Sequence, residues 1–282
     1  MKAAFWIAPE GDDNAVALTP VGPAPEALTA RPAFLGTPAA DALIRRCART
    51  AALLPQLADA LAAQRAGGRN RLFDITEVGE DDRRLIGEAL GEGEVGGVAL
   101  MPQGVTAQIA ETLFAGLWRV RFSDGEGRAV ADYLEVGAIP EAVREAARAA
   151  APELMIGAPP DGAMNVMPVL AEIRERMAAW APGAPAHVVT LSLLPMSPED
   201  VAFLQATLGE GPVRLVSRGY GNCRAIATGA RGVWSVQYTN ASDAVVLDTL
   251  EIGDVPAVAL AADEDFADSS LRLRAIEDAY FR

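Results

Sequence analysis

The hydrophobic and polar positions in the second half of the chain predict one short helix followed by four strands. Ser197 suits the N-cap, Pro198 suits the first helical position, and Asp200 completes a capping-box pattern. Gly209 is a typical helix-ending residue. Apolar, β-branched or aromatic runs then alternate with turn residues: VRLVS, CRAIAT, VWSVQY and AVVLDTLEI. The pattern therefore predicts a helix over 198–208 that is followed by an antiparallel meander.

The first half of the chain repeats this pattern. Residues 72–95 align with residues 190–213, and residues 117–143 align with residues 233–258. Identical pairs in these alignments include Asp82/Asp200, Gly91/Gly209, Trp118/Trp234, Asp132/Asp248 and Glu135/Glu251. A weaker match between the segments that start at Pro55 and Pro168 extends the repeat by one upstream helix. Self-similarity of this kind indicates one supersecondary unit used twice.

We therefore predict an α+β fold with two repeated units, each a helix packed on a small antiparallel meander sheet, in a pseudo-twofold arrangement. The predicted parts are an N-terminal extended segment and helix (1–54), a first repeat (55–150), a linker (151–167), and a second repeat with the final helix (168–282).

Outside the repeats, the pattern predicts further helices over 43–61, 141–150, 169–180 and 269–281, and Pro55 should kink or divide the first of them. Residues 8–38 are rich in proline and small residues and lack periodicity. We expect this segment to be mobile or to wrap over the surface.

Composition excludes several classes of function. The chain has 24 Lys and Arg residues against 38 Asp and Glu residues, and its net charge of -14 disfavours nucleic acid and anionic membranes. No apolar run approaches the roughly 20 residues of a membrane span, and acidic residues interrupt the apolar N-terminus early, so we expect a cytoplasmic protein without membrane insertion. Cys47, Cys223 and the single His187 form no ligand pattern, so we expect no metal and no cofactor.

The densest group of chemically versatile residues is SRGYGNCR, from Ser217 to Arg224. Arg218 and Arg224 could favour a thiolate at Cys223, but the only candidate base, His187, lies in a linker before another strand. A phosphate loop is disfavoured, because GYGNCR lacks the third glycine of G-x-G-x-x-G and precedes a strand where that motif requires a helix. The plain structural interpretation is a turn in which Gly219 and Gly221 supply positive φ angles.

The first repeat provides an internal control for this turn. Its corresponding stretch, LMPQGVTAQ, makes the same strand-to-strand passage without those residues. The motif therefore indicates a specialised surface on the second half. Two other features have structural interpretations: Trp118 and Trp234 are expected to anchor the core, and Glu199 and Asp200 are explained by their place in a first helical turn rather than as an acid/base pair.

Residues 194–252 resemble the C-terminal region of the uptake-hydrogenase expression/formation proteins of the HupH/HyaF type. The similarity rests on LPM-PED, LGEGPV, SRGYGNCR, VW-VQY and LDTLE, which occur in order; Thr239 stands where an aromatic residue is expected. The resemblance implies a chaperone-like maturation factor for a membrane-bound NiFe hydrogenase. Such a protein would bind the iron–sulfur small subunit before export by the twin-arginine route, beside a thioredoxin-like partner.

On this interpretation the protein is not an enzyme and acts by binding its client. The predicted contact segment consists of Arg218, Gly219, Tyr220, Gly221, Asn222, Cys223 and Arg224. A thiol-dependent assembly or repair activity centred on Cys223 is the alternative, and a motif that only braces the two halves is a third. The acidic surface could also help to hold the signal peptide of the client.

Overall fold

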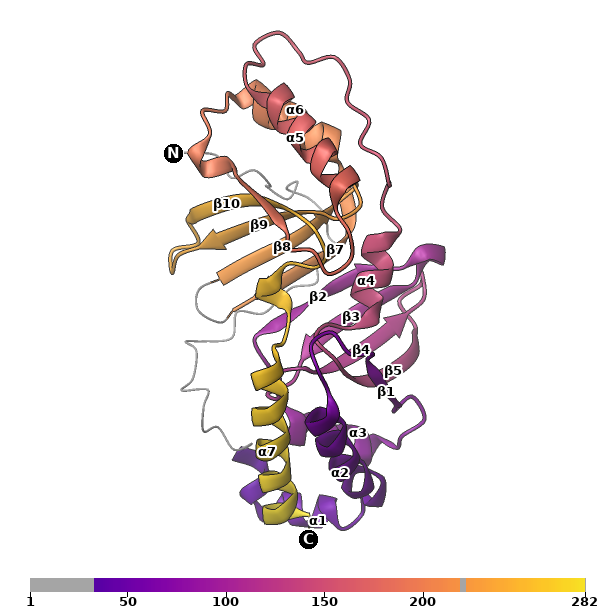
Figure 1. Cartoon of the computed structure of the whole chain (residues 1–282). Helices are drawn as coiled ribbons and strands as arrows, with labels where there is room; N and C mark the ends of the chain where they lie inside the picture. Colours follow the sequence, from indigo (N-terminus) through magenta and orange to yellow (C-terminus); the bar gives the residue numbers. More distant parts are fainter. Residues whose placement is uncertain (1–32, 219–221, 282) are drawn as a thin grey trace. The chain divides into compact units, whose positions relative to one another are not determined.

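The computed structural model describes residues 33–218 and 222–281 of the chain (Figure 1). These residues form two compact units. The N-terminal unit comprises residues 33–146, 213–217 and 257–281, and the C-terminal unit comprises residues 147–212, 218 and 222–256. Each unit combines helices with an antiparallel sheet, so the predicted α+β class is confirmed.

The sheet of the N-terminal unit has the strand order β1-β5-β4-β3-β2, and residues 213–217 of β7 pair with β2. All of these pairings are antiparallel. The bounds are Arg71–Asp74 for β1, Val95–Leu100 for β2, Thr106–Glu111 for β3, Leu117–Ser123 for β4, Ala129–Val136 for β5 and Glu210–Ser217 for β7. Strands β2 to β5 form the predicted meander, while β1 was not among the predicted strands.

Helices accompany this sheet, and all of them except α4 contribute side chains to the core cluster of the N-terminal unit (Figure 1). Their bounds are Pro38–Ile44 for α1, Ala48–Ala63 for α2, Glu80–Leu90 for α3, Glu141–Arg148 for α4 and Asp263–Tyr280 for α7. The core cluster joins Leu57 of α2 and Leu85 of α3 to Leu134 of β5. Burial of such side chains supplies the main driving force for this packing.

The final helix, α7, packs on α2 in the N-terminal unit. Phe266 and Leu273 of α7 lie in the same core cluster as Leu57, and Ser270 Oγ donates a hydrogen bond to the Ala58 carbonyl at 2.8 Å. The predicted boundary, which joined the last helix to the second repeat over 168–282, is therefore corrected. The repeat alignment ends at residue 258, so only proximity along the chain had placed this helix.

Helix α2 passes through Pro55 without a break, so of the two predicted effects, a kink or a division, the division does not occur. The break falls instead at residues 45–47, between α1 and α2. Proline at this position removes one backbone donor, and the Gln56 side chain donates to the nearby Ala52 carbonyl at 2.8 Å. Leu54 and Leu57 on either side are buried, and their packing keeps the helix continuous.

The strands of the C-terminal unit follow one another in the order β8-β9-β10-β6, and the β8–β9, β9–β10 and β10–β6 pairings are antiparallel. The bounds are His187–Thr190 for β6, Asn222–Thr228 for β8, Val233–Thr239 for β9 and Val245–Ile252 for β10. Helices α5, Val166–Ala179, and α6, Pro198–Leu208, cover one end of these strands. The core there joins Ile173 and Leu204 to Val233, Leu250 and Ile252.

Along the chain, both halves show the same element order of helix, strand, helix and four strands: α2-β1-α3-β2 to β5, and α5-β6-α6-β7 to β10. The predicted capping box at Ser197 is present, and Gly209 ends α6 with a φ of 64°. Trp118 and Trp234 are buried, as predicted for core anchors. The pseudo-twofold arrangement stays a prediction.

Candidate functional site

The predicted contact segment starts directly after β7 and ends within β8. Gly219, Tyr220 and Gly221 lie outside the described residues, so the predicted positive φ angles of the two glycines stay untested. Asn222, Cys223 and Arg224 are the first three residues of β8 and pair with Thr239, Tyr238 and Gln237 of β9. The described part of the segment is therefore a strand end.

Successive residues of this strand face opposite sides of the sheet. Asn222 and Arg224 are exposed, whereas Cys223 is only 2% exposed and lies in line with the buried Ala225. The Cys223 side chain is therefore not part of the exposed surface of the strand, and the contact segment as a whole stays a prediction. Arg218 is partly exposed, so the described residues that remain available to a partner are Arg218, Asn222 and Arg224.

The surroundings of Cys223 disfavour a reactive thiolate. Burial raises the pKa of the Cys223 thiol to about 11, the Glu251 carboxylate adds to this rise, and a hydrogen bond with Tyr238 opposes it. Burial likewise raises the pKa of Tyr238 to about 12. Activated cysteines have electropositive surroundings, but the Arg224 side chain leaves the opposite face of the strand. Near neutral pH the thiol therefore stays protonated.

His187 is too far from Cys223 to act as its base. His187 is the first residue of strand β6, and its ring Nε2 lies 2.6 Å from Glu172 Oε1 on α5. Three strand spacings separate β8 from β6, and the two residues are offset by five positions along β9. Standard sheet spacings then place them about 20 Å apart. The structure does not bring this Cys/His pair together.

Asp200 serves a structural role, as its place in the first helical turn predicted. Its Oδ1 accepts backbone N–H groups of Met164, Asn165 and Val166 at 2.8–3.0 Å, and its Oδ2 accepts that of Ser197 at 3.0 Å. Burial tends to raise the pKa of Asp200, but these hydrogen bonds outweigh it and lower the pKa. The carboxylate ties the start of α5 to α6. The sequence indicated only the contact with Ser197.

Other chemistry finds little support in the described part of the chain. Within residues 33–218 and 222–281, no group of three or more His, Cys, Asp or Glu side chains could hold a metal ion. Cys47 and Cys223 are both free and buried. Among the helices in these ranges, none is long and apolar enough to cross a membrane.

Comparison with known proteins decides the family. The model of the HupH hydrogenase expression protein, C-terminal conserved region, matches residues 48–153 and residues 163–280. The chain belongs to the hydrogenase expression/formation protein family. Both matched stretches contain the helix–strand–helix–four-strand order described above, and the second contains SRGYGNCR.

Members of this family match over most or all of the chain. Hydrogenase expression/formation protein HupH of Rhizobium leguminosarum bv. viciae is 57% identical over 282 residues, 100% of both chains. Hydrogenase-1 operon protein HyaF of Escherichia coli is 34% identical over 238 residues, 82% of each chain. A solved structure of hydrogenase expression protein HupH from Thiobacillus denitrificans has 31% identity and a TM-score of 0.37, covering 39% of this chain and 92% of that one.

Proposed function

We propose that the protein is an accessory maturation factor, or chaperone, for the iron–sulfur small subunit of a NiFe uptake hydrogenase. It binds the small-subunit precursor in the cytoplasm before export, beside a thioredoxin-like partner, and carries out no reaction itself. Family membership supports the role in hydrogenase maturation. The relatives are called hydrogenase expression/formation proteins or, for HyaF, a hydrogenase operon protein, and these names refer to no reaction. We also propose that the two halves are copies in a pseudo-twofold arrangement.

The observation that supports the binding mechanism is the exposure of Asn222 and Arg224 at the start of β8. Asn222 and Arg224 project from one face of β8, and the corresponding positions of β3 hold Thr106 and Gln108. Among the described residues, the guanidinium groups of Arg218 and Arg224 have no hydrogen bond or ion pair. On a chain of net charge -14, the exposed guanidinium of Arg224 and the partly exposed one of Arg218 could pair with carboxylates or carbonyl groups of a client.

The first test replaces both arginines. We expect the Arg218→Ala/Arg224→Ala variant to bind the small-subunit precursor at least about tenfold more weakly, because arginines at interface centres carry a large share of binding energy. Affinity is measured by titrating the immobilised precursor with folded protein. The matched control is Arg174→Ala, which removes an exposed guanidinium from α5.

Equal affinity of the folded double variant and the wild type would refute the assignment of the contact segment. A large fall in melting temperature in the double variant, with unchanged affinity of the remaining folded protein, would instead indicate that the motif only braces the fold. Recovery of the small-subunit precursor with tagged protein from hydrogenase-expressing cells tests the function itself, apart from the residues.

The thiol-dependent alternative is tested at Cys223. We expect Cys223→Ala to support precursor binding and hydrogenase activity at the wild-type level, because the buried thiol has a raised pKa and no base nearby. Hydrogenase activity in cells that carry only the variant provides the measurement. Loss of activity with normal precursor binding and a normal melting temperature would favour the thiol mechanism over simple binding.

A further inference from the structure

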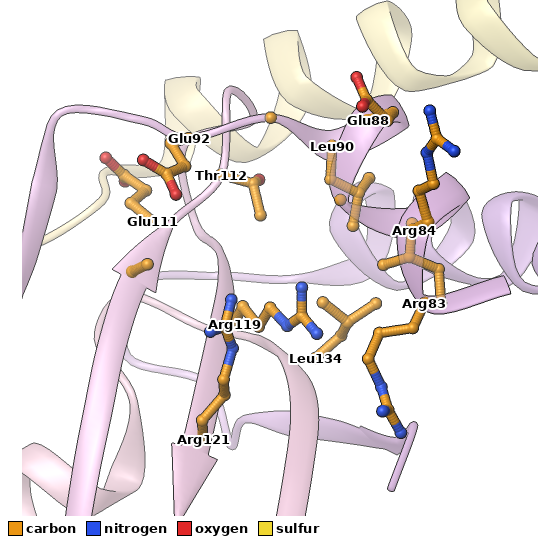
Figure 2. A pocket seen from close by; sticks show the side chains of 14 residues that line it. Arg83, Arg84, Glu88, Leu90, Glu92, Glu111, Thr112, Arg119, Arg121 and Leu134 are labelled. Atoms are coloured by element: carbon orange, nitrogen blue, oxygen red, sulfur yellow. The ribbon is translucent and has the colours of Figure 1, made fainter. Parts of the chain in front are cut away.

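The N-terminal unit contains an arginine-lined cavity that the proposed function does not use. It has a volume of about 370 Å³ and lies between α3 and strands β3 and β4 (Figure 2). Ile86, Leu90 and Leu134 form apolar parts of its wall. The charged part of the lining comes from Arg83, Arg84, Arg119, Arg121, Glu88, Glu92 and Glu111. A cavity of this size is large enough to hold a small ligand, and its lining combines charged groups with apolar side chains.

Three of the four guanidinium groups already have partners. Arg119 forms a two-point ion pair with Asp132, with Nε–Oδ1 and Nη2–Oδ2 distances of 3.0 and 2.6 Å. Arg83 donates to the backbone carbonyls that precede α3, and the Arg84 guanidinium lies over the Phe34 ring. Arg121 has no hydrogen bond or ion pair with any described residue, so its donors are available.

Arg121 lies close to a second guanidinium group. It lies two residues after Arg119 on β4, and Figure 2 shows both side chains extending from that strand into the cavity. Residues at this spacing share one face of a strand. Burial lowers the pKa of Arg121, and the positive charges of Arg119 and Arg83 lower it further, whereas the carboxylates of Asp132 and Glu92 oppose this change. An anion bound between the two groups would relieve this repulsion.

The corresponding positions in the C-terminal unit show that the fold does not need these arginines. Where the first half has Arg119 and Arg121, the second has Ser235 and Gln237, and the acidic residue of the next strand is present in both as Asp132 and Asp248. The two arginines of α3 are likewise replaced in α6: Val201 stands for Arg83 and Ala202 for Arg84. All four guanidinium groups are thus specific to the N-terminal unit.

We propose that this cavity binds a single carboxylate attached to an apolar group, with Arg121 as the main donor and Arg119 beside it. The planar guanidinium fork matches a carboxylate through two parallel hydrogen bonds. Glu88 and Glu92 also line the cavity, and their carboxylates oppose a doubly charged phosphate more strongly than a singly charged acid. The apolar wall accommodates the body of the ligand, which is a small free acid or the C-terminal residue of a polypeptide.

Three simple probes test this proposal in the full-length protein by NMR titration: hexanoate, its uncharged analogue hexanamide, and inorganic phosphate. We expect hexanoate to shift resonances of α3 and β4 and to bind at least about tenfold more tightly than hexanamide, because only the acid pairs with Arg121. Equal binding of acid and amide, or tighter binding of phosphate, would overturn the carboxylate assignment.

Arg121→Gln gives the N-terminal unit the side chain found at the corresponding position of the C-terminal unit. We expect it to weaken hexanoate binding at least about tenfold. The control is Arg128→Gln, which removes an exposed guanidinium paired with Asp124 and Glu126 outside the cavity. Unchanged affinity in folded Arg121→Gln contradicts the proposal. This test uses no client protein, so its failure is separate from failure of the proposed function.

A second pair of probes distinguishes a polypeptide C-terminus from a small free acid as the ligand. The probes are acetyl-Gly-Leu with a free C-terminus and the same peptide with a C-terminal amide. Tighter binding of the free peptide than of hexanoate supports a polypeptide chain end as the ligand, whereas tighter binding of hexanoate supports a small free acid. If neither acid binds more tightly than its amide, the cavity is not a carboxylate site.

Discussion

Replacing Asp200 by alanine is expected to lower the free energy of unfolding by about 4 kcal/mol. The side chain is fully buried and accepts four backbone N–H groups, three at the start of α5 and one at the N-cap of α6. Each buried donor that loses its acceptor costs about 1–3 kcal/mol, and partial rehydration near the exposed Met164 reduces the sum. Urea denaturation at pH 7 measures the loss.

The corresponding residue of the first half provides a matched control. Among the described residues, the Asp82 side chain accepts hydrogen bonds only from Thr50, through its backbone N–H at 2.9 Å and its hydroxyl at 2.7 Å. We therefore expect Asp82→Ala to cost about 2 kcal/mol, roughly half the loss at Asp200. Equal losses at both positions would contradict the assignment of the larger effect to the three N–H groups of α5.

The pH dependence of this effect follows from the lowered pKa of Asp200. Because the folded state holds the carboxylate ionised more strongly than the unfolded state, the stabilisation is fully present above the ordinary value of 3.8. It is lost as the pH falls below 3.8 through the folded-state pKa. The difference in stability between wild type and Asp200→Ala should therefore shrink in acid.

Local patterns predicted the regular elements well because their causes lie within a few residues. The strands follow from alternation and turn residues, and the cap of α6 follows from Ser197, Pro198 and Asp200. The sequence also contained an indication that Cys223 is buried, which the prediction of the contact segment did not use. Cys223, Ala225 and Ala227 are two residues apart in a predicted strand, and small apolar residues with this spacing indicate one buried face.

Features that depend on tertiary contacts could not be predicted in this way. The packing of α7 on α2 joins residues more than 200 positions apart, as in the hydrogen bond from Ser270 to Ala58. The continuity of α2 through Pro55 depends on buried neighbours rather than on helix propensity. The arginine-lined cavity combines residues of α3 and β4 that no spacing rule connects, although comparing the two repeats position by position would have shown that its arginines occur only once.

Glu111 provides the second large effect, which has the opposite dependence on pH. Burial raises its pKa from 4.5 to about 7, against hydrogen bonds from the Gly116 and Val95 backbone, and Asp265 and Glu94 add to the rise. The folded state therefore binds this proton more tightly than the unfolded state does. Stability falls as the pH rises from 4.5 to about 7, and the full loss above that range is about 3 kcal/mol.

Glu111→Gln removes the buried charge and keeps an oxygen that can accept the Gly116 N–H group. We expect the variant to be more stable than wild type by up to about 3 kcal/mol at pH 8.5, and the two proteins to be about equally stable near pH 4.5. Urea denaturation across this range is the measurement, and Glu92→Gln, at an exposed position of the same cavity, is the control. A gain at Glu111 that stays constant from pH 4.5 to 8.5 would come from packing rather than from the charge. A stability gain that grows with pH instead comes from removal of the Glu111 carboxylate, because only its ionisation changes over that range.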